Sequence, residues 1–260
     1  MKIEEELKAD IKKSGFPLEM DVNYILRNKK WNVINEAYYL DQDENKARYI
    51  DIIATRLEQV EASKINRLNV TLVIECKRSI EKPWVFYMVP KGEIHKPDIG
   101  QIALMKNNSQ PALSPPDYRL FWNSHYFSSG IDKVAIRGYV AFADGKNGLN
   151  TAINQSLKAL IYSRNVGSKL LPKLPPKYQG IVVIYYPLVI FDGKMYECEK
   201  DGSDIRLSKA TYIQYEIHYG ISENISEETF LVDVVERDFL NDYLNLVDNE
   251  ISLISAELKS

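Results

Sequence analysis

Several features that would place this chain in a familiar class are missing from its 260 residues. Its two cysteines, Cys76 and Cys198, are too few for a disulfide framework, so a reduced, cytoplasmic protein is expected. No run approaches the roughly 20 apolar residues of a membrane span, and the acidic, helix-like N-terminus does not resemble a signal peptide. The three histidines lack ligand spacing, and no glycine-rich phosphate loop is present. These absences argue against a secreted disulfide scaffold, a membrane protein and an ATP-driven motor.

The composition, with 45% hydrophobic and 27% charged residues, suits one large globular domain or a domain with an insertion or extension. The net charge of −3 is unevenly spread: residues 1–190 hold 27 Lys+Arg against 20 Asp+Glu, and residues 191–260 hold 6 against 16. Between Asp144 and Asp192 the chain has no acid. The bases in this stretch form a basic stripe, which consists of Lys146, Lys158, Arg164, Lys169, Lys173 and Lys177. The stripe fits either a polyanion-binding surface or a solvated face neutralised by the acidic tail.

Hydrophobic periodicity predicts alternating helices and strands. Helices are expected at 2–13, 17–28, 149–165 and 237–258, and a short one within 96–106. Strands are expected at 31–40, 47–57, 68–77, 133–143, 180–191, 211–220 and 229–235. Residues 112–130 read as a loop, and Asp192-Gly193 reads as a turn after a strand buried on both faces. The chain is therefore expected to be an α/β protein.

One charged pair stands out at the end of an apolar strand. Glu-x-Lys occurs four times, but only Glu75 and Lys77 close a run of apolar or Thr residues, Val70–Ile74. Because side chains alternate along a strand, Glu75 and Lys77 share a face. The neighbouring expected strand carries Asp51, flanked by Ile50 and Ile52. Three charged side chains are thus predicted to converge, although a plain strand-end ion pair between Glu75 and Lys77 is the simpler reading.

Two carboxylates at this position need a proton or a cation between them. At about 4 Å and an effective dielectric near 20, they would repel by roughly 4 kcal/mol. Mg²⁺, with Mn²⁺ as a substitute, takes one or two carboxylates and keeps waters for a phosphate. Asp51 and Glu75 are the predicted metal ligands, together with the backbone carbonyl of Cys76. Lys77 would orient and help to deprotonate a metal-bound water, which is a minimal kit for phosphodiester hydrolysis.

The stretches RYIDIIA, around Asp51, and VIECKRS, around Glu75 and Lys77, resemble the restriction-endonuclease-like superfamily of PD-(D/E)xK nucleases. The resemblance covers residues 15–87 well and 149–195 loosely. It implies a central mixed β-sheet flanked by helices, with an acid on the first helix that reaches the metal through water. Glu19, in GFPLE, occupies that position, although a first-turn acid also simply favours the helix dipole.

The resemblance also implies a domain plan. Residues 1–195 would form the nuclease core, with an insertion at about 88–148. Residues 196–260 would form an acidic β/α extension packed on that core. The extension is a candidate surface for a homodimer or a partner protein.

The function that the resemblance implies is Mg²⁺-dependent endonuclease cleavage of DNA, with RNA or branched DNA as other substrates. Ile50 stands where the family motif has proline, and Tyr49 shares the face of Asp51 and could crowd the site. The alternative is therefore an inactive nuclease-fold module that binds nucleic acid or a protein. The sequence does not define the recognition sequence, endo- or exonucleolytic action or pathway.

Four further residues are candidates for nucleic-acid contact. Lys158 and Arg164 lie on the expected 149–165 helix and would contact phosphates. Gln101 could position a nucleotide or water, and Trp84 could stack on a base. Each has an ordinary alternative, which is a solvated surface position for the polar residues and core packing for Trp84.

Overall fold

The computed structural model describes residues 2–60, 65–92, 95–107, 112–114, 117–127, 130–143, 148–175, 180–220 and 227–259. Lys146 and Lys177 of the basic stripe lie outside these ranges, as do residues 115, 116, 128 and 129 of the expected loop. All of the predicted site residues lie inside them.

Helices and strands alternate along most of the chain. The helices are α1 (Lys2–Lys13), α2 (Phe16–Asn28), α3 (Ile99–Ile102), α4 (Gly148–Leu170) and α5 (Leu240–Lys259), with short 3₁₀ turns η2 (Tyr118–Phe121), η3 (Leu171–Lys173) and η6 (Arg237–Phe239). The strands are β1 (Asn32–Asp41), β2 (Lys46–Gln59), β3 (Arg67–Pro90), β4 (Ala103–Lys106), β5 (Lys133–Val140), β6 (Ile181–Asp201), β7 (Asp204–Ala210), β8 (Tyr212–Gly220) and β9 (Glu227–Glu236).

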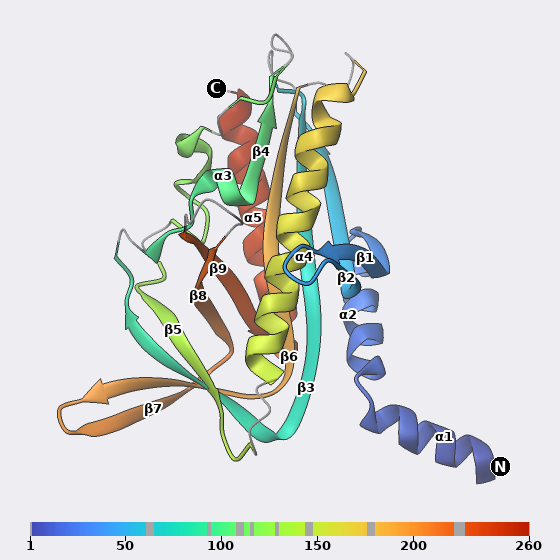
Figure 1. Ribbon diagram of the computed structural model, residues 1–260, viewed down its shortest axis with the longest axis vertical. Helices are drawn as coiled ribbons and strands as arrows, with labels where there is room; N and C mark the ends of the chain where they lie inside the picture. Colours follow the sequence, from blue (N-terminus) through green and yellow to red (C-terminus); the bar gives the residue numbers. More distant parts are fainter. Residues whose placement is uncertain are drawn as a thin grey trace.

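Within the described ranges, nine strands form one mixed sheet (Figure 1). Its order is β1-β2-β3-β5-β8-β9-β6-β4, β7 pairs with β6, and β3 also pairs with β6 in parallel. These pairings close a circuit through β3, β5, β8, β9 and β6, in which β5 and β8 are joined at Ala135 and Tyr215 alone. The long strands β3 and β6 form its centre. The α/β class with a central mixed sheet is confirmed.

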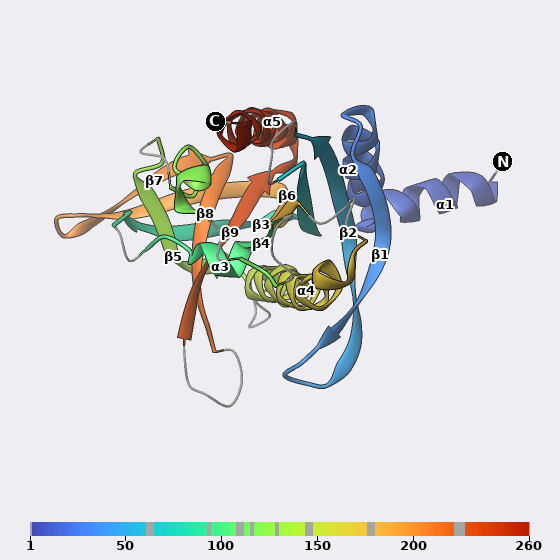
Figure 2. The same ribbon diagram turned by 90° about the horizontal axis from the view of Figure 1, so that it is seen from above.

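Helices cover both faces of the sheet (Figure 2). The apolar residues of α2 and α5 pack on one face, including Leu18, Val22 and Leu244. Those of α4 pack on the other, including Leu149 and Leu157. Residues 181–191 of β6 are all buried because helices lie on both sides of this strand, as the continuous apolar run predicts.

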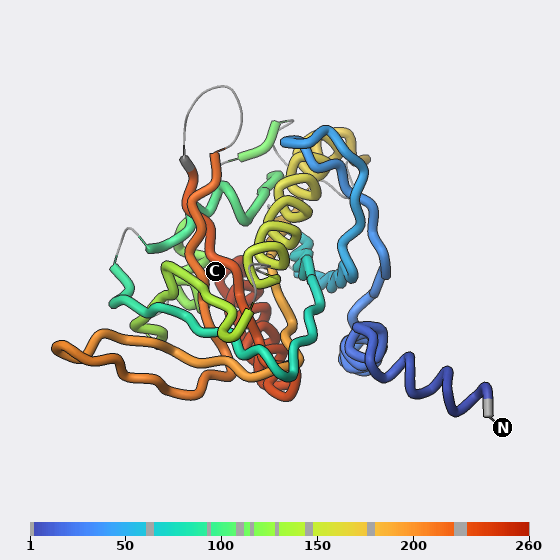
Figure 3. Tube along the Cα trace, turned by 60° about the horizontal axis from the view of Figure 1, so that its bottom comes forward, coloured from blue at the N-terminus to red at the C-terminus, as the bar shows by residue number. Residues whose placement is uncertain are grey.

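The first two helices have different environments. Helix α2 starts at Phe16-Pro17, where proline lacks only an N–H that a first turn leaves unpaired, and it buries Leu18, Val22 and Leu26. In α1, by contrast, the described side chains are exposed, and the helix projects away from the body (Figure 3). None of the described helices has the length and apolar character needed to cross a membrane.

The predicted turn at Asp192-Gly193 is wrong, because β6 runs through it to Asp201. Asp192 and Gly193 pair with Arg78 and Ser79 of β3, and Arg78 Nε lies 3.0 Å from Asp192 Oδ2. A Cβ atom on Gly193 would stand 2.4 Å from Ser79 O. Glycine therefore allows close strand contact here rather than a turn.

The expected insertion and extension are both built into the sheet. Within 88–148, residues 99–106 form the short helix α3 followed by β4, and residues 133–140 form β5. The expected boundary at 195/196 falls inside β6, and β8 and β9 beyond it belong to the same sheet. The structure thus gives a nine-stranded α/β architecture with no break in the sheet at the predicted boundary.

Candidate functional site

The second and third strands bring two acids together. The antiparallel ladder between β2 and β3 reaches the pair Ile52 and Ile74, so Asp51 and Glu75 come next on their strands. There the N–H of Cys76 donates to Oδ2 of Asp51 over 2.7 Å. The Asp51 carboxylate accepts in place of a backbone carbonyl, which holds it against the strand that carries Glu75.

Glu75 and Lys77 form a partly buried ion pair. The Glu75 side chain is 2% exposed and that of Lys77 is 33% exposed, and Lys77 Nζ lies 2.6 Å from Glu75 Oε1. Within the described ranges, the buried second oxygen, Oε2, has no hydrogen-bond partner. Because buried polar atoms are nearly always paired, this carboxylate retains capacity for one more ligand.

The electrostatics of the two acids favour an added positive charge. Burial first, and then repulsion from Asp51, raise the pKa of Glu75 to about 7, despite the attraction of Lys77. Burial also raises the pKa of Asp51, although the Cys76 N–H and Lys77 oppose it. Burial lowers the pKa of Lys77, but Glu75 outweighs burial and the net shift is upward. A proton or a cation between the carboxylates would relieve this strain.

Glu19 belongs to the same cluster. It lies in the first turn of α2 and is half-buried. Burial, followed by repulsion from Asp51 and Glu36, raises the pKa of Glu19, and Lys77 partly offsets the rise. The structure therefore brings Glu19 close enough to the acids and the lysine for their charges to interact.

Glu36 is a further acid of this cluster that sequence reasoning missed. The β1–β2 register passes from Asn35 opposite Ile52 to Ala37 opposite Ile50, so Glu36 falls opposite Asp51 with the register unchanged. The φ of Glu36, 48°, is left-handed, so the regular strand conformation of β1 is interrupted at this residue. Repulsion from Glu36 raises the pKa of both Glu19 and Asp51. The register of one strand on its neighbour has no clear signal in the sequence, so Glu36 could not be singled out there.

The donor set fits a Mg²⁺ ion that keeps most of its waters. Two carboxylates are available, and one oxygen of Glu75 is unpaired within the described ranges. No group of three or more His, Cys, Asp or Glu side chains that could hold a metal is found in the described part of the chain. The contact seen for Cys76 is made by its N–H to Asp51, so ligation by the Cys76 carbonyl stays a prediction. A closed metal cage is not what this cluster offers.

The predicted DNA-contact residues have partners inside the protein. Trp84 is 2% exposed and stacks on Phe191, with ring centroids 3.9 Å apart. Gln101 is buried at the start of α3, where its Oε1 accepts a hydrogen bond from Arg164. Arg164 also donates to Gly100 O over 3.1 Å. Trp84 therefore occupies a core position, and the other two link α4 to α3.

Lys158 is held by acids of the β1–β2 turn. Its Nζ lies 3.0 Å from Asp41 Oδ2 and 2.7 Å from Asp43 Oδ2. This pairing joins α4 to the outer strands and occupies the amine that was expected to meet a phosphate. Tyr49, expected to crowd Asp51, is 62% exposed and packs edge-on against Tyr38.

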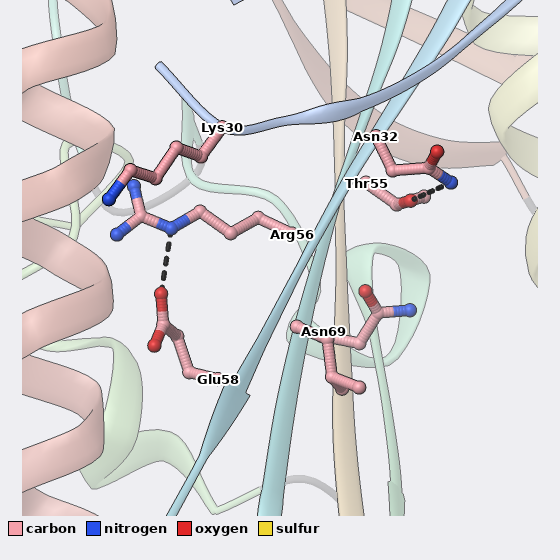
Figure 4. Close-up of a pocket in the computed structure, with 7 residues that line it drawn as sticks. Lys30, Asn32, Thr55, Arg56, Glu58 and Asn69 are labelled. Carbon is pink, nitrogen blue, oxygen red and sulfur yellow. Dashed lines mark hydrogen bonds and ion pairs between the residues drawn. The ribbon is translucent and has the colours of Figure 1, made fainter. Parts of the chain in front are cut away.

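A polar pocket of about 700 Å³ lies farther along β2 (Figure 4). It is lined by Lys30, Asn32, Thr55, Arg56, Leu57, Glu58 and Asn69. The Arg56 guanidinium is held by Glu58 at 2.7 Å and by Asp248 at 2.6 Å. Arg56, a cation of this pocket, is therefore already paired within the protein. The lining residues show no catalytic arrangement.

A second titratable cluster is fully buried away from this site. Its centre is His125, with Nε2 2.8 Å from Asp233 Oδ2 and Nδ1 2.7 Å from Glu250 Oε1. The hydroxyl groups of Tyr126, Tyr186, Tyr212 and Tyr243 donate to the two carboxylates. Sequence reasoning missed this cluster because its members are far apart along the chain. Its burial excludes substrate and indicates a structural role.

Comparison with known proteins assigns no family. No protein-family model, curated protein or solved structure matches this chain. The functional inference therefore depends on the geometry of Glu19, Asp51, Glu75 and Lys77.

Proposed function

We propose that this protein is a metal-dependent nuclease that hydrolyses DNA phosphodiester bonds, as the likeness to PD-(D/E)xK nucleases implies. One observation carries the proposal: Asp51 and Glu75 meet at adjacent positions of β2 and β3, and Lys77 lies 2.6 Å from Glu75. Two acids and an amine on an apolar sheet are costly unless they serve a bound charge.

The residues divide the work of hydrolysis. Asp51 and Glu75 would hold Mg²⁺ or Mn²⁺, with Cys76 supplying a backbone oxygen. The ion, when bound, lowers the pKa of a water and stabilises charge on the phosphate. Lys77, as an ammonium, would orient and activate the attacking water by stabilising the hydroxide that forms, and Glu19 would hold an outer water. The water oxygen bonds to phosphorus as one P–O ester bond breaks, and the leaving oxygen takes up a proton.

The second candidate is a nuclease-fold module without catalysis that binds nucleic acid or a protein. The absence of a three-ligand group in the described part of the chain favours it. RNA or branched DNA as substrate, and a homodimer or partner contact through the acidic C-terminal region, remain further proposals for the same chain.

The decisive experiment is incubation of plasmid DNA with the purified protein and Mg²⁺ or Mn²⁺, against an EDTA control. We expect metal-dependent cleavage in the parent. Asp51→Asn and Lys77→Ala should each lower the rate by about 10²–10⁴-fold, because each removes a group that acts on the metal or water.

The matched control is Lys8→Ala, which removes the lysine of an exposed Glu-x-Lys on α1. It should cleave like the parent. If Asp51→Asn and Lys77→Ala also cleave like the parent, the site assignment is wrong. If the parent binds DNA but no metal supports cleavage, the non-catalytic module is the better description.

A further inference from the structure

A basic groove lies beside the candidate site, between the end of α1 and the bend of β3. It has a volume of about 390 Å³ and is lined by Lys12, Lys13, Arg78, Lys82 and one acid, Glu81, with Ser79 and Ile80 between them. The lining therefore holds four cations and one acid, and because Arg78 is paired with Asp192, three lysines are left against Glu81, in a chain whose overall charge is −3.

The groove is fixed by contacts of Arg78. Its Nη1 donates to the carbonyl oxygen of Lys12, and its Nε lies 3.0 Å from Asp192 Oδ2. Arg78 thus ties the C-terminal end of α1 to β3 and β6. Because of this tie, Lys12 and Lys13 are presented beside β3 although the rest of α1 projects from the body (Figure 3).

The groove is formed by two segments that adjoin the catalytic candidates along the chain. Arg78 directly follows Lys77 on β3, and α1 leads directly into α2, whose first turn carries Glu19. A chain of phosphates with one member at Asp51 and Glu75 would continue towards the neighbouring cations. Lys12, Lys13 and Lys82 are exposed, so their amines can reach a ligand in solvent.

We infer that this groove binds the sugar–phosphate backbone of DNA next to the scissile bond. The inference deepens the proposed function and rests on it for the identity of the polyanion. Lysines act as point charges on phosphates and read no base edges, so the groove positions DNA without sequence preference. Lys158 and Arg164, by contrast, are already paired with protein groups.

The test measures DNA binding apart from cleavage. The full-length protein is titrated in EDTA against two fluorescein-labelled 20-bp duplexes of unrelated sequence, over a range of NaCl concentrations. The groove variant is Lys12→Ala/Lys13→Ala/Lys82→Ala. The matched control, Lys46→Ala/Lys200→Ala/Lys259→Ala, removes three exposed lysines outside the groove and the basic stripe. Thermal melting confirms that both variants fold like the parent.

The groove variant should bind both duplexes about 10-fold or more weakly than the parent. The negative slope of log K against log salt should become shallower by about three. The control should keep the slope of the parent. If the groove variant binds like the parent, if the control weakens as much, or if the parent binds no DNA, the inference is overturned. If the parent cleaves DNA but binding does not depend on the groove, the groove inference is wrong and the nuclease proposal stands. If binding depends on the groove but no cleavage occurs, the groove inference stands and the nuclease proposal is wrong.

Discussion

His125 is the single residue whose charge matters most to the interior. Its ring is 1% exposed and lies between Asp233 and Glu250. Burial on its own lowers the pKa of His125, but Glu250 and Asp233 outweigh burial and raise the pKa to about 10. The ring is therefore an imidazolium at neutral pH, and it places a positive charge between two carboxylates in the core.

This arrangement predicts that the protein loses stability in alkaline solution. In the unfolded chain His125 loses its proton near pH 6.5, whereas in the folded protein it keeps the proton to about pH 10. The stabilisation is complete below pH 6.5 and declines as pH rises to 10. The free energy of unfolding should fall by up to about 1.4 kcal/mol per pH unit over this range, as measured by urea denaturation at pH 7 and pH 9.5.

The control for this prediction is His125→Gln. At pH 7 the variant should be about 3–5 kcal/mol less stable, because two buried acids lose their cation. It should also lose less stability than the parent between pH 7 and pH 9.5. An equal loss in both proteins would show that His125 is not the titrating group.

The residues of the candidate site differ in how far the sequence could reveal them. Asp51, Glu75 and Lys77 follow from strand periodicity, since charges inside apolar strands stand out. Glu36 joins them only because the pairing of β1 with β2 places it opposite Asp51, which depends on the register of a folded sheet. Buried partners such as Asp233 are equally hidden, because their contacts span more than 100 residues.

At the scale of elements, α4 is joined to the two central strands by Ser156. The Ser156 hydroxyl donates to Val73 O and accepts from Leu188 N, both over 2.9 Å. Pro187, opposite Val73, brings no N–H of its own to the sheet. Val73 lies two residues before Glu75. The hydrogen bond from Ser156 therefore holds α4 against the part of β3 that carries the candidate site.

Removing this bridge should destabilise the protein. Ser156→Ala leaves a buried N–H and a buried C=O without their partner, so the free energy of unfolding should fall by about 1–3 kcal/mol. Hydrogen exchange at Leu188 should become faster. Ser163→Ala is the control, because among the described residues its hydroxyl bonds to Ala159 O of the same helix. It should cost about 0.5 kcal/mol or less, and equal costs for both variants would contradict a role for the bridge.

Element prediction succeeded where local pattern and tertiary context agree. Helix 149–165 is found and continues to Leu170, because its apolar face packs on the sheet. The turn at Asp192-Gly193 fails, because pairing with β3 outweighs the local preference of Asp-Gly. Strand β7 was not expected: Ile205 and Leu207 alternate with polar residues, but the segment is short and its residues before Ala210 are exposed, so its position depends on pairing with β6.

At the scale of the whole molecule, the acidic C-terminal region balances the basic remainder from within. Asp248 of α5 pairs with Arg56 at 2.6 Å and with Lys29 at 3.8 Å, and Glu199 of β6 pairs with Lys133 at 2.6 Å. Some acids of the C-terminal region thus form ion pairs inside the molecule. The reading of the tail as a source of counter-charges gains support from these pairs.

The continuity of the sheet predicts that residues 1–195 will not fold alone. Truncation there cuts β6, removes β8 and β9, and takes away Glu250 and Asp233, which leaves His125 without its partners. We expect the truncated chain to lack a cooperative thermal transition by circular dichroism. Deletion of residues 2–13 is the contrast, because the described α1 side chains are exposed, and that chain should melt within a few degrees of the parent. A soluble 1–195 fragment with a sharp transition near that of the parent would instead establish the C-terminal region as a separable extension.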